Sequence, residues 1–188
     1  MRRMIIVLTL VTVLSGLVLA ATFASLSPRI ELNRERALQA SLAALFSDVD
    51  EPQFEQLEIE EMDIYRGEDA EGRLIGYAVA VTASGYNGPI SMLLGLTPDL
   101  QQIEGLQVVE NRETPGLGAR ITEEQFREQF IGLDPMQSIT TIRHVEPDPA
   151  ANEVQAISGA TISSEAVVDA INRRAEQAID AIRDAEDR

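Results

Sequence analysis

The chain has 188 residues and a formal net charge of −16, from 31 acidic residues against 15 arginines and no lysine. With no cysteine and one histidine, it excludes disulfide scaffolds, thiolate-bound zinc, iron–sulfur clusters and sites built from several histidines. A chain this acidic is a poor partner for nucleic acid, because the phosphates would repel it. At 45% hydrophobic and 24% charged residues, the composition is that of a folded protein.

The charge is unevenly distributed along the chain. Residues 1–27 contain two arginines and no acid, whereas residues 28–188 contain 13 arginines and all 31 acids, for a net charge of −18. The sequence therefore predicts two parts, an N-terminal membrane anchor over residues 1–28 and an extracytoplasmic domain over residues 29–188.

The predicted anchor is the uncharged run Met4–Leu26, whose 23 residues can cross a hydrocarbon core of about 30 Å as a helix. Arg2 and Arg3 precede the run, which places the N-terminus in the cytoplasm by the positive-inside rule. A cleaved signal peptide with its apolar region at Ile5–Leu19 is the alternative. The apolar run continues past that region, which favours a retained anchor. We expect a single-pass protein of the inner membrane, with its domain in the periplasm.

The rest of the chain predicts an α+β domain, an antiparallel sheet flanked by helices. Apolar residues at helical spacing indicate helices over Glu31–Phe46, Ile121–Ile131 and Glu165–Asp187. Alternating apolar residues between turn signals indicate strands over Leu57–Tyr65, Leu74–Thr82, Ile90–Leu96, Ile103–Val109 and Met136–Val145. The first two strands are expected to pair as a hairpin across the polar loop of residues 67–72.

The usual catalytic constellations are missing. His144 is the only imidazole, and it lies in a strand-like stretch with no nucleophile motif beside it. An ordinary surface or partly buried histidine is the simpler interpretation. We therefore predict no catalytic residue and no metal site, and the chain alone does not identify an enzyme.

The first segment that could have a chemical role leads directly into the last predicted helix. Its glycine and alanine let the backbone approach a bound group, and the amides of a helix N-terminus suit a phosphate. Thr161 adds a hydroxyl at that point, and three serines add further donors. Taken alone, a capped helix after a glycine turn explains the segment as well. The residues are Ser158, Gly159, Ala160, Thr161, Ile162, Ser163 and Ser164.

The second segment is a rigid turn with two glycines around one apolar residue, Leu117. Such a loop can lay backbone amides and an apolar side chain against a planar ligand. Taken alone, it is an ordinary Pro-Gly turn. The residues are Glu113, Thr114, Pro115, Gly116, Leu117 and Gly118.

Together these segments resemble the FMN-binding domain that occurs in the G subunit of the Rnf electron transport complex and in the C subunit of the sodium-pumping NADH:quinone oxidoreductase. Ser158–Thr161 is similar to the S/T-G-A-T flavinylation motif of that domain, and Glu113–Gly118 matches its E-T-P-G-L-G loop. Residues 85–90, Gly-Tyr-Asn-Gly-Pro-Ile, are similar to its G-Y-x-G-P-I turn. Three motifs in the family's order are far more specific than any one. The short chain favours the Rnf protein.

The resemblance implies that FMN is joined by a phosphoester to Thr161. A separate flavin transferase would attach it, using FAD and Mg²⁺. The isoalloxazine would lie against the loop, with the redox chemistry belonging to the flavin. The implied FMN-binding residues are Thr161, Ser158, Gly159, Ala160, Ser163, Ser164, Glu113, Thr114, Gly116, Leu117, Gly118 and Tyr86.

The function implied is that of a redox subunit of a translocase. The chain would carry electrons within an Rnf-type ion-translocating ferredoxin:NAD⁺ oxidoreductase, beside other membrane subunits. The sequence departs from the family at Gln155, where an aspartate associated with the transferase is usual, and at Asn111 and Asn87, where histidine and glycine are common. Two alternatives stay open: a non-redox flavin-binding or sensory module, and a membrane-anchored scaffold without flavin.

Overall fold

The computed structural model describes residues 2–47, 49–59 and 62–186, and the chain divides into two compact units, Met1–Gln39 and Ala40–Arg188. Helix α1 (Arg2–Leu45) is continuous from the first unit into the second and contains Pro28. The predicted helix over Glu31–Phe46 is therefore the C-terminal part of α1. The domain boundary after residue 28 stays a prediction.

The N-terminal part of α1 has the length and composition of a membrane-spanning helix, with a mean hydropathy of 2.7 over its most apolar 18 residues. The hydroxyls of Thr12, Thr22 and Ser25 each donate to the carbonyl four residues earlier, at 2.8–2.9 Å. Polar groups satisfied inside their own helix are what a hydrocarbon environment requires. The expected long apolar N-terminal helix is thus confirmed.

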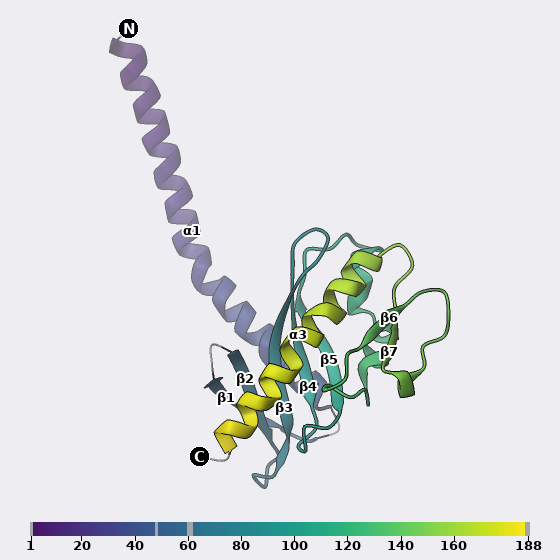
Figure 1. The fold of residues 1–188 in the computed structure, drawn as a ribbon. Coiled ribbons are helices and arrows are strands. Elements are labelled where there is room, and N and C mark those ends of the chain that lie inside the picture. Colours follow the sequence, from purple (N-terminus) through teal and green to yellow (C-terminus); the bar gives the residue numbers. More distant parts are fainter. Residues whose placement is uncertain (1, 48, 60–61, 187–188) are drawn as a thin grey trace. The chain divides into compact units, whose positions relative to one another are not determined.

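The second unit is built on a five-stranded antiparallel sheet in which neighbours in sequence are neighbours in space (Figure 1). This confirms the α+β class and the antiparallel sheet. The strands are β1 (Gln53–Ile59), β2 (Met62–Glu68), β3 (Leu74–Ser84), β4 (Pro89–Leu96) and β5 (Ile103–Glu110).

The single strand predicted over Leu57–Tyr65 is wrong, because the chain reverses within it. Ile59 at the end of β1 is paired with Met62 at the start of β2; Glu60 and Glu61 lie outside the described residues. Leu57 and Ile59 fall on odd positions, whereas Met62 and Ile64 fall on even positions. Such a change of phase marks a turn. The hairpin expected between the first two predicted strands is present as the antiparallel pair β2 and β3.

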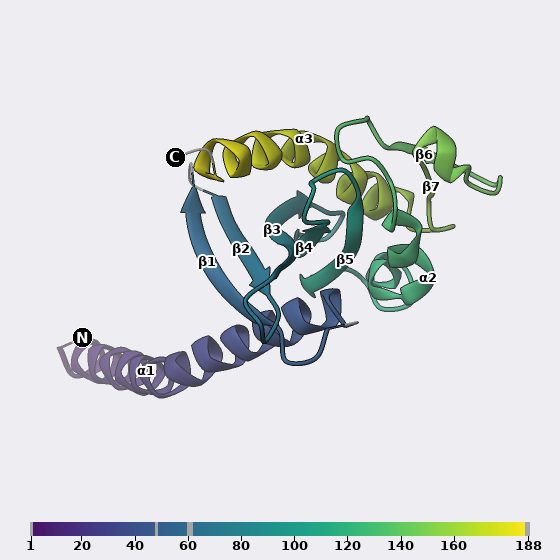
Figure 2. The same ribbon diagram turned by 90° about the horizontal axis from the view of Figure 1, so that it is seen from below.

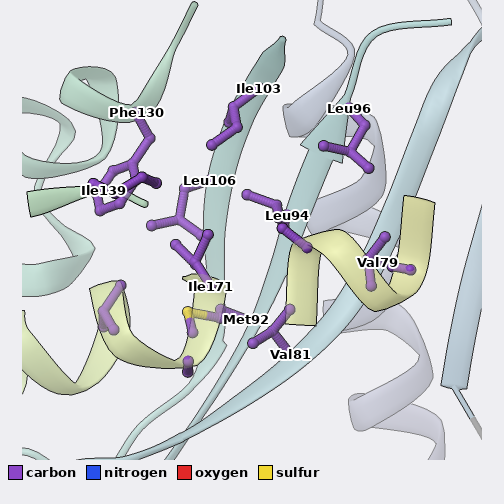
Figure 3. Packing of buried hydrophobic residues seen from close by; sticks show 14 of the residues in the cluster. Val79, Val81, Met92, Leu94, Leu96, Ile103, Leu106, Phe130, Ile139 and Ile171 are labelled. Carbon is purple, nitrogen blue, oxygen red and sulfur yellow. The ribbon is translucent and has the colours of Figure 1, made fainter. Parts of the chain in front are cut away.

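Helix α3 (Thr161–Glu186) lies along one face of the sheet in both ribbon views (Figures 1 and 2). It begins four residues before the predicted helix, and Asp187 lies outside the described residues. Its apolar stripe meets side chains that alternate inward from the strands, such as Val79 and Val81 of β3 and Met92 and Leu94 of β4 (Figure 3). Burial of this stripe holds the helix, and therefore its first turn, in a fixed place on the sheet.

The segment between β5 and α3 differs most from expectation. Instead of one helix over Ile121–Ile131, it forms short turns: 3-10 helices at Gly118–Thr122 and Glu128–Phe130 around α2 (Glu124–Arg127). Buried Phe126 and Phe130 pack edge to face, with ring centroids 5.4 Å apart. These aromatic contacts hold the segment without a regular helix.

The strand predicted over Met136–Val145 is wrong in extent. β6 covers only Thr140–Ile142 and pairs in parallel with β7 (Glu153–Gln155), which the sequence did not suggest. His144 lies beyond β6 in an exposed bend with a left-handed backbone (φ +59°). It is a surface residue, as expected, although its backbone is not a strand.

Candidate functional site

Three segments that are far apart in the sequence surround one cavity of about 460 Å³ in the second unit. They are the turn between β3 and β4, the loop after β5 and the first turn of α3. Most of the predicted site residues meet here, together with Ile162, which was not predicted. The cavity is lined by Tyr86, Glu113, Thr114, Leu117, Gly118, Gly159, Ala160, Thr161, Ile162 and Ser163.

The buried carboxylate of Glu113 joins these three segments. Its Oε1 accepts the backbone N–H of Asn87 at 2.8 Å, and its Oε2 accepts the hydroxyl of Ser163 at 2.7 Å. The side-chain amide of Asn87 also donates to the hydroxyl of Thr114 at 2.8 Å. Glu113 itself is only 6% exposed, so these bonds are shielded from water.

The backbone approaches this carboxylate closely at a glycine. A Cβ on Gly118 would lie 2.8 Å from the Oγ of Ser163 and would overlap Oε2 of Glu113. Real Cβ atoms do not come so close to other heavy atoms, so only glycine fits without moving the link between Glu113 and Ser163. The second glycine of the Gly-Leu-Gly sequence, Gly118, is therefore required because any side chain there would clash with Glu113 and Ser163.

Thr161 is the first residue of α3, half-buried, and lines the cavity. The amide of Ser164 donates to the carbonyl of Ala160 at 3.0 Å. By helix geometry, the amides before it in the first turn lack an intrahelical acceptor. They give this end of the cavity donors and a partial positive charge, which suit an anionic group.

The serines of the first turn bond to the protein itself. Ser163 donates to Glu113, and Ser164 donates to the carbonyl of Ala160 at 3.0 Å while accepting the amide of Ile157 at 3.1 Å. Both serines are buried. Each hydroxyl hydrogen is thus used in shaping the site, whereas the predicted role of these serines toward a ligand stays a prediction.

Besides the buried Ser164, two other predicted residues lie outside the lining of the cavity. Ser158 is exposed and borders a separate depression of about 360 Å³, which Gln155 and Phe126 also line. Gly116 is exposed at the tip of its loop with φ +75°. The sequence placed both in the right loops but could not tell which residues of a loop point to the cavity.

The mouth of the cavity is apolar. Tyr86, Leu117 and Ile162 are 70%, 49% and 56% exposed, although each is a large hydrophobic side chain. The volume falls in the range of small-molecule sites, which combine apolar walls with a few placed polar groups. A ligand with a flat apolar part and an anionic group, such as FMN, fits this distribution: the anion at the start of α3 and the flat part at the rim.

Gln155 has a structural explanation. Its side-chain amide donates to the carbonyl of Val145 at 2.8 Å, and its backbone amide donates to the Oε1 of Gln129 at 2.7 Å. An aspartate could not make the first bond, because a carboxylate has no donor. Gln155 therefore ties the strand that leads into Ser158–Thr161 to the neighbouring loops.

Comparison with known proteins places these features in one family. The FMN-binding domain family matches residues 85–176, a stretch that contains all three segments of the site. The G subunit of the ion-translocating oxidoreductase complex of Methanosarcina acetivorans is 31% identical over 178 residues, or 90% of each chain. The G subunit of the proton-translocating ferredoxin:NAD(+) oxidoreductase complex of Clostridium ljungdahlii is 31% identical over 170 residues, covering 90% of this chain and 87% of the relative.

Solved structures share the fold. NqrC of Shewanella oneidensis superimposes with a TM-score of 0.55 at 23% identity, over 59% of this chain and 54% of that one. The C subunit of the Na⁺-translocating NADH-quinone reductase of Parabacteroides distasonis gives 0.53 at 25% identity, over 60% and 58%. The chain thus spans somewhat more than half of each solved structure. With similarity to G subunits over most of its length, the chain belongs to the FMN-binding domain family that includes the G subunits of ion-translocating oxidoreductase complexes.

Proposed function

We propose that this chain carries FMN bound covalently through a phosphoester to Thr161, and that it serves as the electron-carrying G subunit of an Rnf-type ion-translocating ferredoxin:NAD⁺ oxidoreductase. The observation that carries the proposal is the cavity at the start of α3, where Thr161 and the Glu113–Gly118 loop face the same space. The names of the similar proteins from Methanosarcina acetivorans and Clostridium ljungdahlii support the assignment to a translocating complex.

Thr161 is the preferred acceptor among four hydroxyls that are close in sequence. Those of Ser163 and Ser164 are buried and donate to Glu113 and to Ala160. That of Ser158 is exposed, but it borders the other depression. Thr161 combines access to the cavity with the donors of the helix N-terminus, which would lie next to a phosphate on its hydroxyl.

Attachment would be the work of a separate flavin transferase using FAD and Mg²⁺. The Thr161 oxygen forms a bond to the phosphorus of the FMN half as the bond between the two FAD phosphates breaks. AMP leaves, and the hydroxyl proton passes to solvent. No base from this chain is needed in that scheme, which agrees with the exposed position of its single histidine.

Once bound, FMN would supply one- and two-electron redox chemistry. The chain's own residues then hold and orient it. Helix α3 fixes the phosphate end because its apolar stripe is buried on the sheet. Leu117, Tyr86 and Ile162 provide an apolar rim that leaves the mouth open, so that a redox partner can come close.

A membrane location is supported by α1, which is long and apolar enough to cross a bilayer. We place the chain in the cell's inner membrane as a single-pass protein, with a cytoplasmic N-terminus and a periplasmic domain. Its partners would be the other membrane subunits of the complex, together with the flavin transferase during maturation.

The test is covalent flavin on the full chain, isolated from cells that also express a flavin transferase. A denaturing gel under ultraviolet light should show a fluorescent band, and the intact mass should exceed that of the polypeptide by FMN minus water. Thr161→Ala should abolish both signals, whereas Ser138→Ala, which removes an exposed hydroxyl outside the motif and outside the cavity, should keep them.

Two results would contradict the proposal. A wild-type chain that never gains the mass would point to a scaffold without flavin, and a fluorescent Thr161→Ala chain would place the attachment elsewhere. A flavin-loaded chain that extracts from membranes alone, without polytopic subunits, would instead indicate a separate flavin-binding or sensory module.

A further inference from the structure

We propose that the buried carboxylate of Glu113 lowers the reduction potential of the flavin held in this cavity, a role separate from its part in joining the loops. The inference rests on the proposed function, because it requires FMN at this site. The geometry that carries it is a carboxylate side chain, 6% exposed, in the wall of the cavity that Thr161 also lines.

The carboxylate of Glu113 forms no salt bridge with any residue that the structure describes. Within residues 2–47, 49–59 and 62–186, no arginine nitrogen lies within 4.0 Å of its carboxylate. Its two hydrogen bonds come from neutral donors, the backbone amide of Asn87 and the hydroxyl of Ser163. Accepting at both oxygens is the pattern of an ionised carboxylate. The side chain therefore brings a carboxylate held only by neutral donors next to the ligand space.

A buried charge acts more strongly than a surface charge. Coulomb energy rises as the effective dielectric constant falls, and salt screens exposed groups far more than buried ones. A negative charge in the cavity wall opposes the arrival of an electron on the ligand beside it. The helix N-terminus at Thr161 acts in the opposite sense, and the carboxylate bonds to Ser163 in the same first turn, so removing the carboxylate leaves this partial positive charge unopposed.

The chain carries many other carboxylates, so the effect must be specific to position. Glu110 is a matched comparison, since it is three residues earlier in the chain, at the exposed end of β5. Removing either side chain changes the formal charge equally. Only Glu113 lines the cavity, so only its removal should move the potential appreciably.

The experiment is a spectroelectrochemical titration of the full-length, flavin-loaded chain. Glu113→Gln keeps the shape and an acceptor for the amide of Asn87, and its new amide can donate to the Oγ of Ser163. We expect the equilibrium constant for one-electron reduction of this variant to rise at least tenfold. This corresponds to a reduction potential higher by about 59 mV. Glu110→Gln should shift it by less than a quarter of that amount.

A purely architectural role predicts a different pattern. It would lower the melting temperature of Glu113→Gln without moving the potential, and that result would overturn the inference. Ser163→Ala provides an independent arm, because it removes one bond to the carboxylate but keeps the charge. Its potential should equal that of the wild type or fall below it.

Ser163→Ala also decides the case in which Glu113→Gln takes up no flavin. Ser163→Ala retains the carboxylate. A tenfold rise in its equilibrium constant for one-electron reduction would therefore show that the geometry of the site, and not the charge of Glu113, sets the potential. A wild-type chain that carries no flavin would contradict the proposed function. A flavin-loaded chain whose reduction potential does not change in Glu113→Gln would contradict only this inference.

Discussion

The hydroxyl of Ser163 donates to the carboxylate of Glu113 at 2.7 Å, across fifty residues of sequence. This bond ties the first turn of α3 to the loop after β5, and the amide of Asn87 adds the turn between β3 and β4. The three segments share one buried anchor. The shape of the cavity therefore depends on one charged side chain and on the glycine that fits against it.

Gly118→Ala should weaken the site through a clash. The new Cβ would overlap the Glu113 carboxylate and lie 2.8 Å from the Oγ of Ser163, so the link between them must shift. We expect a loss of about 1–3 kcal/mol in the free energy of unfolding and at least tenfold slower flavin incorporation. Denaturant unfolding and in-gel fluorescence measure the two effects.

Gly132→Ala is the control for glycine loss as such. Gly132 has φ +79°, and no atom lies within 4 Å of its added Cβ. The strain of a left-handed alanine should cost about 1 kcal/mol and leave flavin incorporation unchanged. Equal incorporation by the two variants would argue against a steric role for Gly118.

Gln155→Asp should separate folding from maturation. The aspartate cannot donate to the carbonyl of Val145, so we expect a loss of about 0.5–1.5 kcal/mol in unfolding free energy. It also restores the residue associated with the transferase in the resembling family, so incorporation should become faster. Gln155→Asn, which is too short for the bond but lacks the carboxylate, should lose stability without this gain. Equal rates in both variants would contradict the prediction.

Tyr77 should make the folded chain sensitive to alkali. Burial, and then its hydrogen bond to the Glu186 carboxylate, raises the pKa of Tyr77 from its ordinary value near 10 to about 12. The native state therefore keeps a proton that the unfolded state loses. This contribution to stability is complete below pH 10 and disappears as the pH rises from 10 to 12.

The prediction is checked by measuring tyrosinate absorbance and the free energy of unfolding as functions of pH. With three tyrosines and no tryptophan, the chain gives a simple titration. Tyr77→Phe should remove the step near pH 12 and flatten the stability profile between pH 10 and 12. An unchanged titration curve would place the late step on another tyrosine.

Asn172→Ala should loosen the segment before β6. The Oδ1 of Asn172 accepts the amide of Ile139 at 2.8 Å, and its Nδ2 donates to the carbonyl of Ile139 at 2.9 Å. The Asn172 side chain thus satisfies both backbone groups of Ile139, as a neighbouring strand would do in a sheet. Its loss leaves both backbone groups unpaired, which should cost about 1–3 kcal/mol. Gln177→Ala, at an exposed position of the same helix, should stay within about 0.5 kcal/mol.

Elements with a strong apolar period were predictable from the sequence. The strands β3, β4 and β5 and the helix α3 carry the alternation or the stripe that packs into the core. The three loops of the site were also predictable, because their glycines and polar residues recur as family motifs. What the motifs could not give was the direction of each side chain.

The unpredicted parts depend on contacts between distant residues. The pair β6 and β7 has three residues in each strand, too few for any periodicity, and the Asn172 side chain supports the chain before it. The predicted helix over Ile121–Ile131 is replaced by short turns, from which Phe126 and Phe130 enter the core formed by the sheet and α3. Ser163 was expected at a ligand, but it bonds to Glu113 from a loop fifty residues away, which the sequence alone cannot bring beside it.

Ser164 closes the loop before α3 on itself, accepting from Ile157 and donating to Ala160. Its position in the core means that this loop takes its shape only when the helix has docked on the sheet. An enzyme that modifies Thr161 would therefore meet a finished surface and not an extended peptide. Under the proposed function, maturation would then have a fixed order, in which the domain folds first and misfolded copies receive no cofactor.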